Sequence, residues 1–278
     1  MEVFSFLLIV INVYVSYKGL SNRSFFENYK FEVDKILINK DYIRLVSSGF
    51  LHINWVHLVF NMLTLYSFSG LIETKLGGFG FLLIYFSSLI GGDLLSLFIH
   101  KNHGDYSSVG ASGAVSGIVF ASIALFPGLD LNLFGSSLAI PSWLYGILYV
   151  MYSIYGIKSQ KDNIGHDAHL GGALLGMLVA LGLLPSAIEE NLLVIIILIL
   201  PILTFIYLIV TKPNVLLIDN FYFKKQKKYL SIDDKYNSDK KEKEKQIDSI
   251  LEKISEKGIN SLSSTEKMIL DEYSQKIN

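Results

Sequence analysis

Apolar residues occur along this chain in long runs that are separated by shorter polar segments. The runs of roughly membrane-spanning length cover residues 3–17, 53–74, 79–100, 112–127, 138–157, 167–184 and 191–211. The fourth run is short and ends at Pro127, and Pro201 predicts a kink in the last one. The pattern predicts an all-α polytopic membrane protein with a six-helix core and a seventh transmembrane helix.

The N-terminal part contains one run and one long polar segment. The first run opens almost at Met1, without a basic segment or a small-residue cleavage site, so it predicts a transmembrane helix and not a removed signal peptide. Residues 18–50 are too polar to span a membrane. Their aromatic side chains predict a structured loop that lies at the membrane interface.

The composition changes after Lys212. Residues 224–246 are rich in Lys, Asp and Glu, which is typical of a solvated linker. Apolar residues from Ile247 to Ile254 recur at helical spacing before Gly258, and residues 263–266 fit a capping box that opens a second helix. We therefore divide the chain into a core at 1–184, an additional transmembrane helix at 185–211, a charged linker at 212–246 and a small helical tail at 247–278.

The overall composition agrees with a membrane protein. Of the 278 residues, 51% are hydrophobic and 18% are charged, and the mean hydropathy is +0.43. A soluble domain of this size needs more polar surface. The chain has no cysteine, which excludes disulfides, a thiol nucleophile and a zinc site built on cysteine.

All six histidines occur in close pairs, and ionisable residues inside a membrane are candidates for function. The pairs are His52 with His57, His100 with His103, and His166 with His169. Because successive spans run antiparallel, the second, fourth and sixth spans share one direction. The first turns of these three spans hold His57 and Asn61, then Ser112, then His169. The sequence therefore predicts that these side chains lie at similar depth on one side of the membrane.

These residue types suit nucleophilic catalysis. His57 and Asn61 are four positions apart, so both face one way and can donate hydrogen bonds to an oxyanion, together with the Ser112 backbone N–H. His169 suits the role of the base that takes the proton of Ser112. Gly172 and Gly176 predict close packing of the sixth span on the fourth. No carboxylate is placed as a third member, which favours a Ser–His dyad.

The same residues are also compatible with a structural or a metal-binding role. Ser112 is also a plausible N-cap on a closely packed helix, and His57 with Asn61 a plausible interhelical hydrogen-bonding pair. His166 and His169 could bind a metal with His52 or His57, although no Glu accompanies them in a zinc-protease motif. His100 and His103 lie where a span ends, so we expect them to be solvated.

The joint motif set resembles the rhomboid intramembrane serine proteases over about residues 1–184. The motifs are Gly110-x-Ser112-Gly113, His57-x-x-x-Asn61 and Ala168-His169-x-x-Gly172-x-x-x-Gly176. The resemblance implies Ser112 as nucleophile, His169 as base, and an oxyanion hole made of His57, Asn61 and the Ser112 amide. The positions it implies as supporting are Gly110, Gly113, His52, His166, Gly172, Gly176, Arg44 and Glu73.

Two positions depart from the family pattern. Arg44 matches the arginine of the family's Trp-Arg loop motif, but Ile43 replaces the tryptophan. Some rhomboids carry an aromatic residue at the position of Ser116, where it stacks on the catalytic imidazole, and this chain lacks that ring.

Glu73 matches a family position to which the resemblance gives a structural role.

The resemblance implies an intramembrane serine endopeptidase of the bacterial inner membrane, without cofactor or metal. Its implied partners are transmembrane protein substrates and the lipid bilayer, and no nucleic acid. The alternatives are a catalytically silent relative that binds membrane helices, and a histidine-lined metal or proton transporter.

The resemblance and the loop charges disagree about orientation. The resemblance places the first loop and the site on the outer face of the membrane. The positive-inside rule predicts the opposite, because nearly all cations of the loops lie on the side of the site. They are Lys18, Arg23, Lys30, Lys35, Lys40, Arg44, Lys101, Lys158 and Lys161, against Lys75 on the other side.

Overall fold

The computed structural model describes residues 2–132, 139–159 and 165–211, and six residues of the tail (247, 250, 251, 253, 254 and 270). Its helices are α1 (Val3–Ser21), α2 (Arg23–Tyr29), α3 (Val33–Leu37), α4 (Arg44–Ser47), the 3-10 helix η1 (Ser48–Phe50), α5 (Trp55–His100), α6 (Ser112–Leu125), α7 (Ser142–Ser159), α8 (His166–Leu183) and α9 (Ser186–Thr211). The expected all-α membrane fold is confirmed.

Two short antiparallel pairings complete the described secondary structure. Strand β1 (Phe31–Glu32) pairs with β2 (Ser107–Ser108), with Phe31 opposite Ser108. Strand β3 (Asp130–Asn132) pairs with β4 (Ala139–Pro141), with Asp130 opposite Pro141. The first pair fastens the loop after α1 to the loop between α5 and α6.

The long helix α5 is two spans joined at a kink. Gly77 has φ 73° and ψ 170°, a backbone conformation that glycine adopts readily and other residues avoid. The two runs predicted at 53–74 and 79–100 are thus the two arms of α5. Four of the described helices, α1, α5, α8 and α9, are long and apolar enough to cross a membrane, and α6 is a shorter apolar helix of 14 residues.

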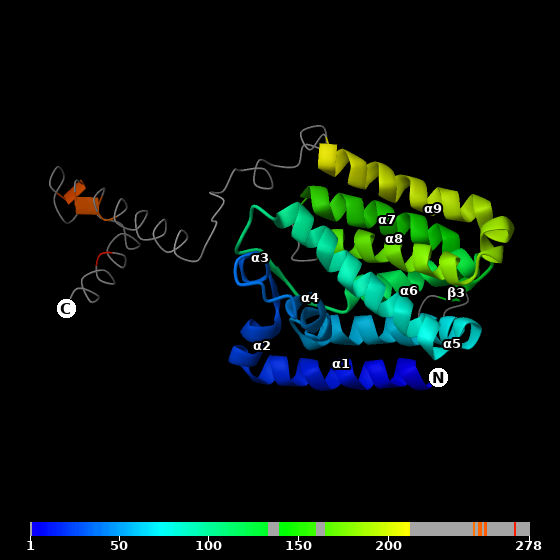
Figure 1. Ribbon diagram of the computed structural model, residues 1–278, viewed down its shortest axis with the longest axis horizontal. Helices are drawn as coiled ribbons and strands as arrows, with labels where there is room; N and C mark the ends of the chain where they lie inside the picture. Colours follow the sequence, from blue (N-terminus) through cyan, green and yellow to red (C-terminus); the bar gives the residue numbers. More distant parts are fainter. Residues whose placement is uncertain are drawn as a thin grey trace. The chain divides into compact units, whose positions relative to one another are not determined.

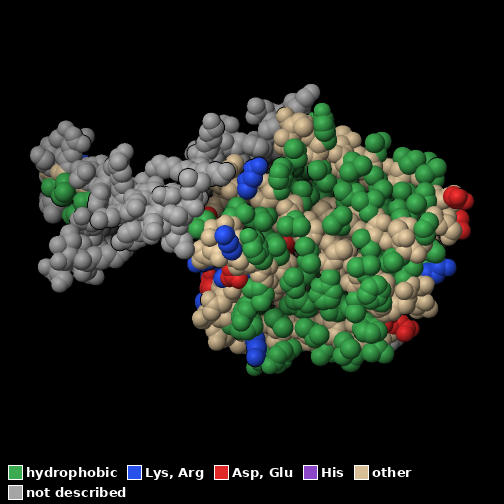
Figure 2. All heavy atoms as spheres, in the orientation of Figure 1, with side chains coloured by type: hydrophobic (Ala, Val, Ile, Leu, Met, Phe, Trp, Pro, Cys, Tyr) green, Lys and Arg blue, Asp and Glu red, His purple; other side chains and the backbone are tan. Residues whose placement is uncertain are grey.

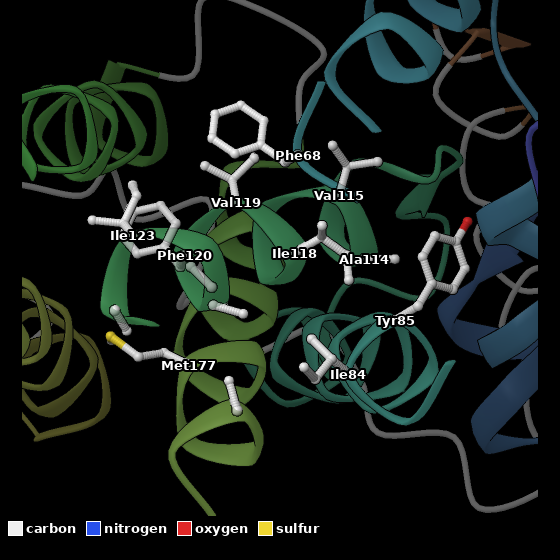
Figure 3. Packing of buried hydrophobic residues seen from close by; sticks show 14 of the residues in the cluster. Phe68, Ile84, Tyr85, Ala114, Val115, Ile118, Val119, Phe120, Ile123 and Met177 are labelled. Atoms are coloured by element: carbon white, nitrogen blue, oxygen red, sulfur yellow. The ribbon is translucent and has the colours of Figure 1, made fainter. Parts of the chain in front are cut away.

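The short helix α6 forms the centre of the bundle. Every residue from Gly113 to Leu125 is buried. In Figure 1, α1 and α9 lie at opposite edges of the bundle, with α6 and α8 between them. Figure 3 shows Val115, Ile118 and Phe120 of α6 packed among side chains of α5 and α8. The outer faces carry many exposed apolar side chains (Figure 2), as expected for contact with lipid.

The first loop is organised around a buried arginine. Arg44 is 5% exposed, and its guanidinium pairs with Asp41 at 2.7 Å. It also donates to the carbonyl oxygens of Glu27, at 3.0 Å, and Lys30, at 2.7 Å. One side chain thus holds the end of α2 against α4, and the prediction of a structured loop is confirmed. Ile43, in the place of the family's tryptophan, is 60% exposed.

A buried carboxylate fastens α1 to α5. Glu73 accepts hydrogen bonds at 2.9 Å from the backbone N–H groups of Phe4 and Ser5, and another from the Ser5 hydroxyl. These N–H groups belong to the first turn of α1 and have no partner within the helix. Glu73 therefore caps α1 from a neighbouring helix.

Residues 1–226 and 227–278 form two separate compact units. In the second unit Ile247, Ile250, Leu251 and Ile254 are helical, where the apolar spacing predicts a helix. The linker at 212–246, Gly258 and the capping box at 263–266 lie outside the described residues.

Candidate active site

Three helices begin around one cavity of about 670 Å³. Helix α5 starts after Asn54, whose side-chain oxygen accepts from the His57 N–H at 2.8 Å, as an N-cap does. Helix α6 starts at Ser112, and α8 starts at His166. The cavity is lined by Ser112, His169, His57 and Asn61 together. The four predicted site residues are therefore brought to one place by three helix N-terminal turns.

The turn into α6 requires glycine at Gly110. Its φ of 134° lies in the region that residues with a side chain avoid. A Cβ atom there would lie 2.8 Å from Cε1 and 3.0 Å from Nε2 of His57, and 3.5 Å from Oγ of Ser112. The Nε2 edge of His57 and the Ser112 hydroxyl therefore face the same small space.

Glycines set the distance between α6 and α8. A methyl group on Gly172 would overlap the backbone of Gly113, and one on Gly176 would overlap the backbone of Gly117. Gly113 itself faces the carbonyl oxygen of Ala168, the residue before His169. The helices approach at backbone contact, which brings the first turn of α8 beside the first turn of α6.

Three hydrogen-bond donors belong to residues that line the cavity, His57, Asn61 and Ser112. The Asn61 amide donates one hydrogen to the His57 carbonyl at 3.1 Å and keeps a second for another acceptor. The Ser112 N–H is the first of α6 and has no partner within the helix. With the Nε2 edge of His57, these groups suit an oxyanion.

The aromatic neighbour of His169 is Tyr149 of α7, a residue that sequence reasoning missed. The Tyr149 ring centroid lies 5.9 Å from that of His169, with 31° between the planes. The Tyr149 hydroxyl lies 2.6 Å from the Ser116 hydroxyl, which donates to the Ser112 carbonyl at 2.7 Å. Since Ser116 has one hydrogen, Tyr149 donates to Ser116. Although Ser116 lacks the family's ring, the chain supplies one from another helix.

His52 lies behind His57 and is fully buried. Its Nδ1 is 2.7 Å from the Ser16 hydroxyl, which donates to the Phe50 carbonyl at 2.9 Å. Ser16 must therefore accept from His52, which places the imidazole hydrogen on Nδ1. Burial, and to a smaller degree the neighbouring His57, lowers the pKa of His52 to about 3. His52 is therefore neutral, and its hydrogen bond to Ser16 joins the turn before α5 to α1.

The expectation that His100 and His103 are solvated is wrong. They are 4% and 2% exposed. His100 lies 3.2 Å from a carboxylate oxygen of Asp167 and stacks on the Tyr106 ring with 3.5 Å between centroids. The loop after α5 folds back over its own helix end and covers both imidazoles.

The remaining histidine, His166, is 2% exposed, and its ring centroid lies 5.6 Å from that of His169. Among the residues that the structure describes, no three His, Asp or Glu side chains are grouped so that they could hold a metal ion. The alternative metal site of His166 and His169 with His52 or His57 therefore lacks its ligand set.

The fold and this site define a polytopic helical membrane protein with a serine and a histidine in the lining of one cavity. The family model of the Rhomboid domain matches residues 39–186, which is more than half of the chain. The chain belongs to the rhomboid family, and it is an integral membrane protein. A second model, for a family of unknown function (DUF6576), matches residues 230–276.

Several curated proteins are similar to this chain. Rhomboid protein 1, mitochondrial, of Saccharomyces cerevisiae is 32% identical over 54% of this chain and 45% of its own length. The Rhomboid protease GluP of Bacillus subtilis is 28% identical over 67% of this chain and 34% of its own length. The Rhomboid protease AarA of Providencia stuartii is 29% identical over 53% of this chain and 58% of its own length.

The chain spans about half the length of the curated relatives it matches. The relatives include mitochondrial and chloroplast proteins as well as bacterial ones. The bacterial inner membrane therefore stays a prediction for this chain.

Proposed function

We propose that this chain is a serine endopeptidase that cleaves transmembrane segments of membrane proteins by a Ser112–His169 dyad. The observation that carries the proposal is the shared cavity, in which the serine, the histidine and two further donors meet at the N-terminal turns of α5, α6 and α8. The names of two relatives, both rhomboid proteases, favour the same activity.

Each of the site residues has one role in the proposed hydrolysis. The Ser112 Oγ attacks the scissile carbonyl carbon while its proton passes to His169. The carbonyl oxygen becomes an oxyanion that accepts hydrogen bonds from His57, Asn61 and the Ser112 N–H. The C–N bond then breaks, and His169 returns the proton to the leaving amine. The acyl group is then held as an ester on the Ser112 Oγ. A water molecule, deprotonated by His169, attacks the carbonyl carbon of this ester, the C–Oγ bond breaks, and His169 returns the proton to Ser112 as the carboxylic acid product leaves.

The position of the cavity among membrane-spanning helices indicates the class of substrate. A transmembrane helix cannot present a carbonyl while its backbone is hydrogen-bonded internally, so the substrate must unwind locally. Helix-breaking and small residues near one membrane surface favour unwinding. The cavity, of about 670 Å³, is lined by polar and apolar side chains and leaves room for an extended backbone and for water.

The test is cleavage of a reporter in proteoliposomes. The reporter carries Gly and Pro near one end of its transmembrane helix, and a matched reporter carries Leu there. We expect the unmodified chain to cut the first reporter faster, and Ser112→Ala and His169→Ala to cut neither. Ser122→Ala removes another buried serine of α6 and is the matched control that retains activity. A chain that cuts neither reporter would favour the catalytically silent relative.

A further inference from the structure

The second arm of α5, residues 78–100, carries a stripe of polar side chains that the proposed hydrolysis does not use. The stripe is formed by Asp93, Ser96 and His100, which follow one another at spacings of three and four residues and so face one way. All three side chains are buried. Ionisable side chains inside a membrane protein are costly to bury, and they are therefore candidates for a function.

The same arm of α5 packs against the starts of α6 and α8. A Cβ atom on Gly92, the neighbour of Asp93, would lie 2.5 Å from the carbonyl oxygen of Ala168 in the first turn of α8. A Cβ atom on Gly113, in the first turn of α6, would lie 3.3 Å from the same carbonyl oxygen. The three backbones therefore meet beside the site, and in Figure 1 this arm of α5 crosses the other two helices.

Asp93 is connected through one serine to the turn that precedes Ser112. An Asp93 carboxyl oxygen lies 2.9 Å from the Ser48 hydroxyl, and the Ser48 carbonyl accepts the Gly110 N–H at 3.1 Å. Gly110 is the residue whose backbone lies against the Nε2 edge of His57 and the Ser112 hydroxyl. A carboxyl group of α5 is thus two hydrogen bonds away from the backbone of the turn that leads to the nucleophile.

The bond between Asp93 and Ser48 needs a polar side chain and not a charge. The Ser48 hydroxyl has one hydrogen, and it lies 2.6 Å from the Arg44 carbonyl oxygen as well as 2.9 Å from the Asp93 carboxyl. It can donate to Asp93, or it can donate to Arg44 and accept from a protonated Asp93. An amide at position 93 can also donate or accept, whereas an alkyl group can do neither. Substitution by Asn and by Leu therefore separates the bond from the bulk of the side chain.

Asp167 is connected to the same arm of α5 from the other side of the site. This side chain is buried, and one of its carboxyl oxygens lies 3.2 Å from Nε2 of His100. Asp167 and His169 are two residues apart in α8, so their side chains leave the helix in directions about 200° apart. Asp167 therefore faces α5 while His169 faces the cavity. The His100 ring is held in turn by its stack on the Tyr106 ring.

We propose that Asp93 and Asp167 are positioning residues for the Ser112–His169 dyad. Asp93, acting through Ser48, fixes the turn that precedes the nucleophile. Asp167, held by the end of α5, fixes the first turn of α8, which carries the base. One arm of α5 thus sets the distance between nucleophile and base, although neither carboxyl group lines the cavity. The expected effect on rate rests on the proposed function, and the expected effect on the backbone does not.

The first test compares Leu and Asn variants in the full chain. The measurements are the rate at which Ser112 reacts with a fluorophosphonate, and kcat and KM for the reporter with Gly and Pro. We expect Asp93→Leu and Asp167→Leu to lower the reaction rate and kcat at least tenfold with KM unchanged, because a small misplacement of reacting groups costs a large factor. Asp93→Asn and Asp167→Asn keep the hydrogen bonds and should stay within about threefold of the unmodified rate. Leu and Asn variants with equal rates would overturn the proposal.

A double-mutant cycle tests the path through Ser48. Ser48→Ala should lower the reaction rate, and adding it to Asp93→Leu should cause no further loss, because both changes remove the same hydrogen bond. Ser69→Ala removes a fully buried serine from the first arm of α5 and is the matched control that leaves the rate unchanged. Losses that multiply in the double variant would overturn the role of Asp93.

Hydrogen–deuterium exchange tests the inference without any activity. In Asp93→Leu the peptide 107–113 should exchange faster than in the unmodified chain, because the Gly110 N–H donates to Ser48. In Asp167→Leu the peptide 165–172 should exchange faster. Unchanged exchange in both variants would overturn the positioning roles even where Ser112 reacts with the fluorophosphonate. Faster exchange in a chain whose Ser112 does not react would confirm the two connections and contradict the proposed function alone.

Discussion

The aromatic ring beside His169 comes from a different helix than the motif pattern indicates. Sequence reasoning looked for it at Ser116, one turn after Ser112, because that position faces the imidazole from the same helix. Tyr149 lies 33 positions further along, in α7, and reaches both His169 and Ser116. No local spacing marks Tyr149 among the many tyrosines of α7, since its role depends on how α7 packs on α6 and α8.

Because Tyr149 contacts both His169 and Ser116, it should fix the position of the His169 imidazole relative to the first turns of α6. Tyr149→Phe keeps the ring and loses one hydrogen bond, so we expect a decrease of about fivefold in the rate of reaction with a fluorophosphonate, from about 1 kcal/mol. Tyr149→Ala should decrease the rate by a larger factor. The exposed residue of the same helix, Tyr155, gives the control Tyr155→Ala. A folded Tyr149→Ala protein that reacts at the unmodified rate would contradict this role.

The apolar pattern predicts the long helices, and the predicted bounds differ from the observed ones by a few residues. The runs predicted at 112–127 and 167–184 are observed as Ser112–Leu125 and His166–Leu183. The run at 138–157 begins later, at Ser142, because residues 139–141 form β4 and Pro141 disfavours a helical residue before it. The short helices α2 to α4 were not predicted individually. The position of α2 against α4 depends on the bonds of Arg44 and not on periodicity.

The contact of α6 with α8 gives a prediction with a control in the same helix. Gly172→Ala places a methyl group against the Gly113 backbone, so the helices must separate. We expect a lower unfolding temperature and at least a tenfold loss of activity. At Gly182, also in α8, a Cβ meets nothing within 4 Å, so Gly182→Ala should change stability by no more than about 1 kcal/mol. Equal behaviour of the two variants would refute the packing argument.

At the scale of the whole molecule, alternation of span direction predicted which side chains lie at the same end of the bundle. That rule needs only the number of spans, and it places Ser112, His169, His57 and Asn61 at one end of the bundle. The burial of His100 and His103 was not predictable in this way. Their environment is made by Tyr106 and Asp167, which a loop and another helix bring to them. The rule gives the depth of a residue, and tertiary packing decides whether it is solvated.

The most direct measurement of the central claim is the mass of a covalent adduct. The purified full chain is treated with a fluorophosphonate in mild detergent, and its peptides are mapped by mass spectrometry. We predict one modified residue, Ser112, in the unmodified chain and in Ser122→Ala, and no adduct in Ser112→Ala or His169→Ala. An adduct on another serine, or a folded chain that forms none, would contradict the assignment of Ser112 as a nucleophile activated by His169.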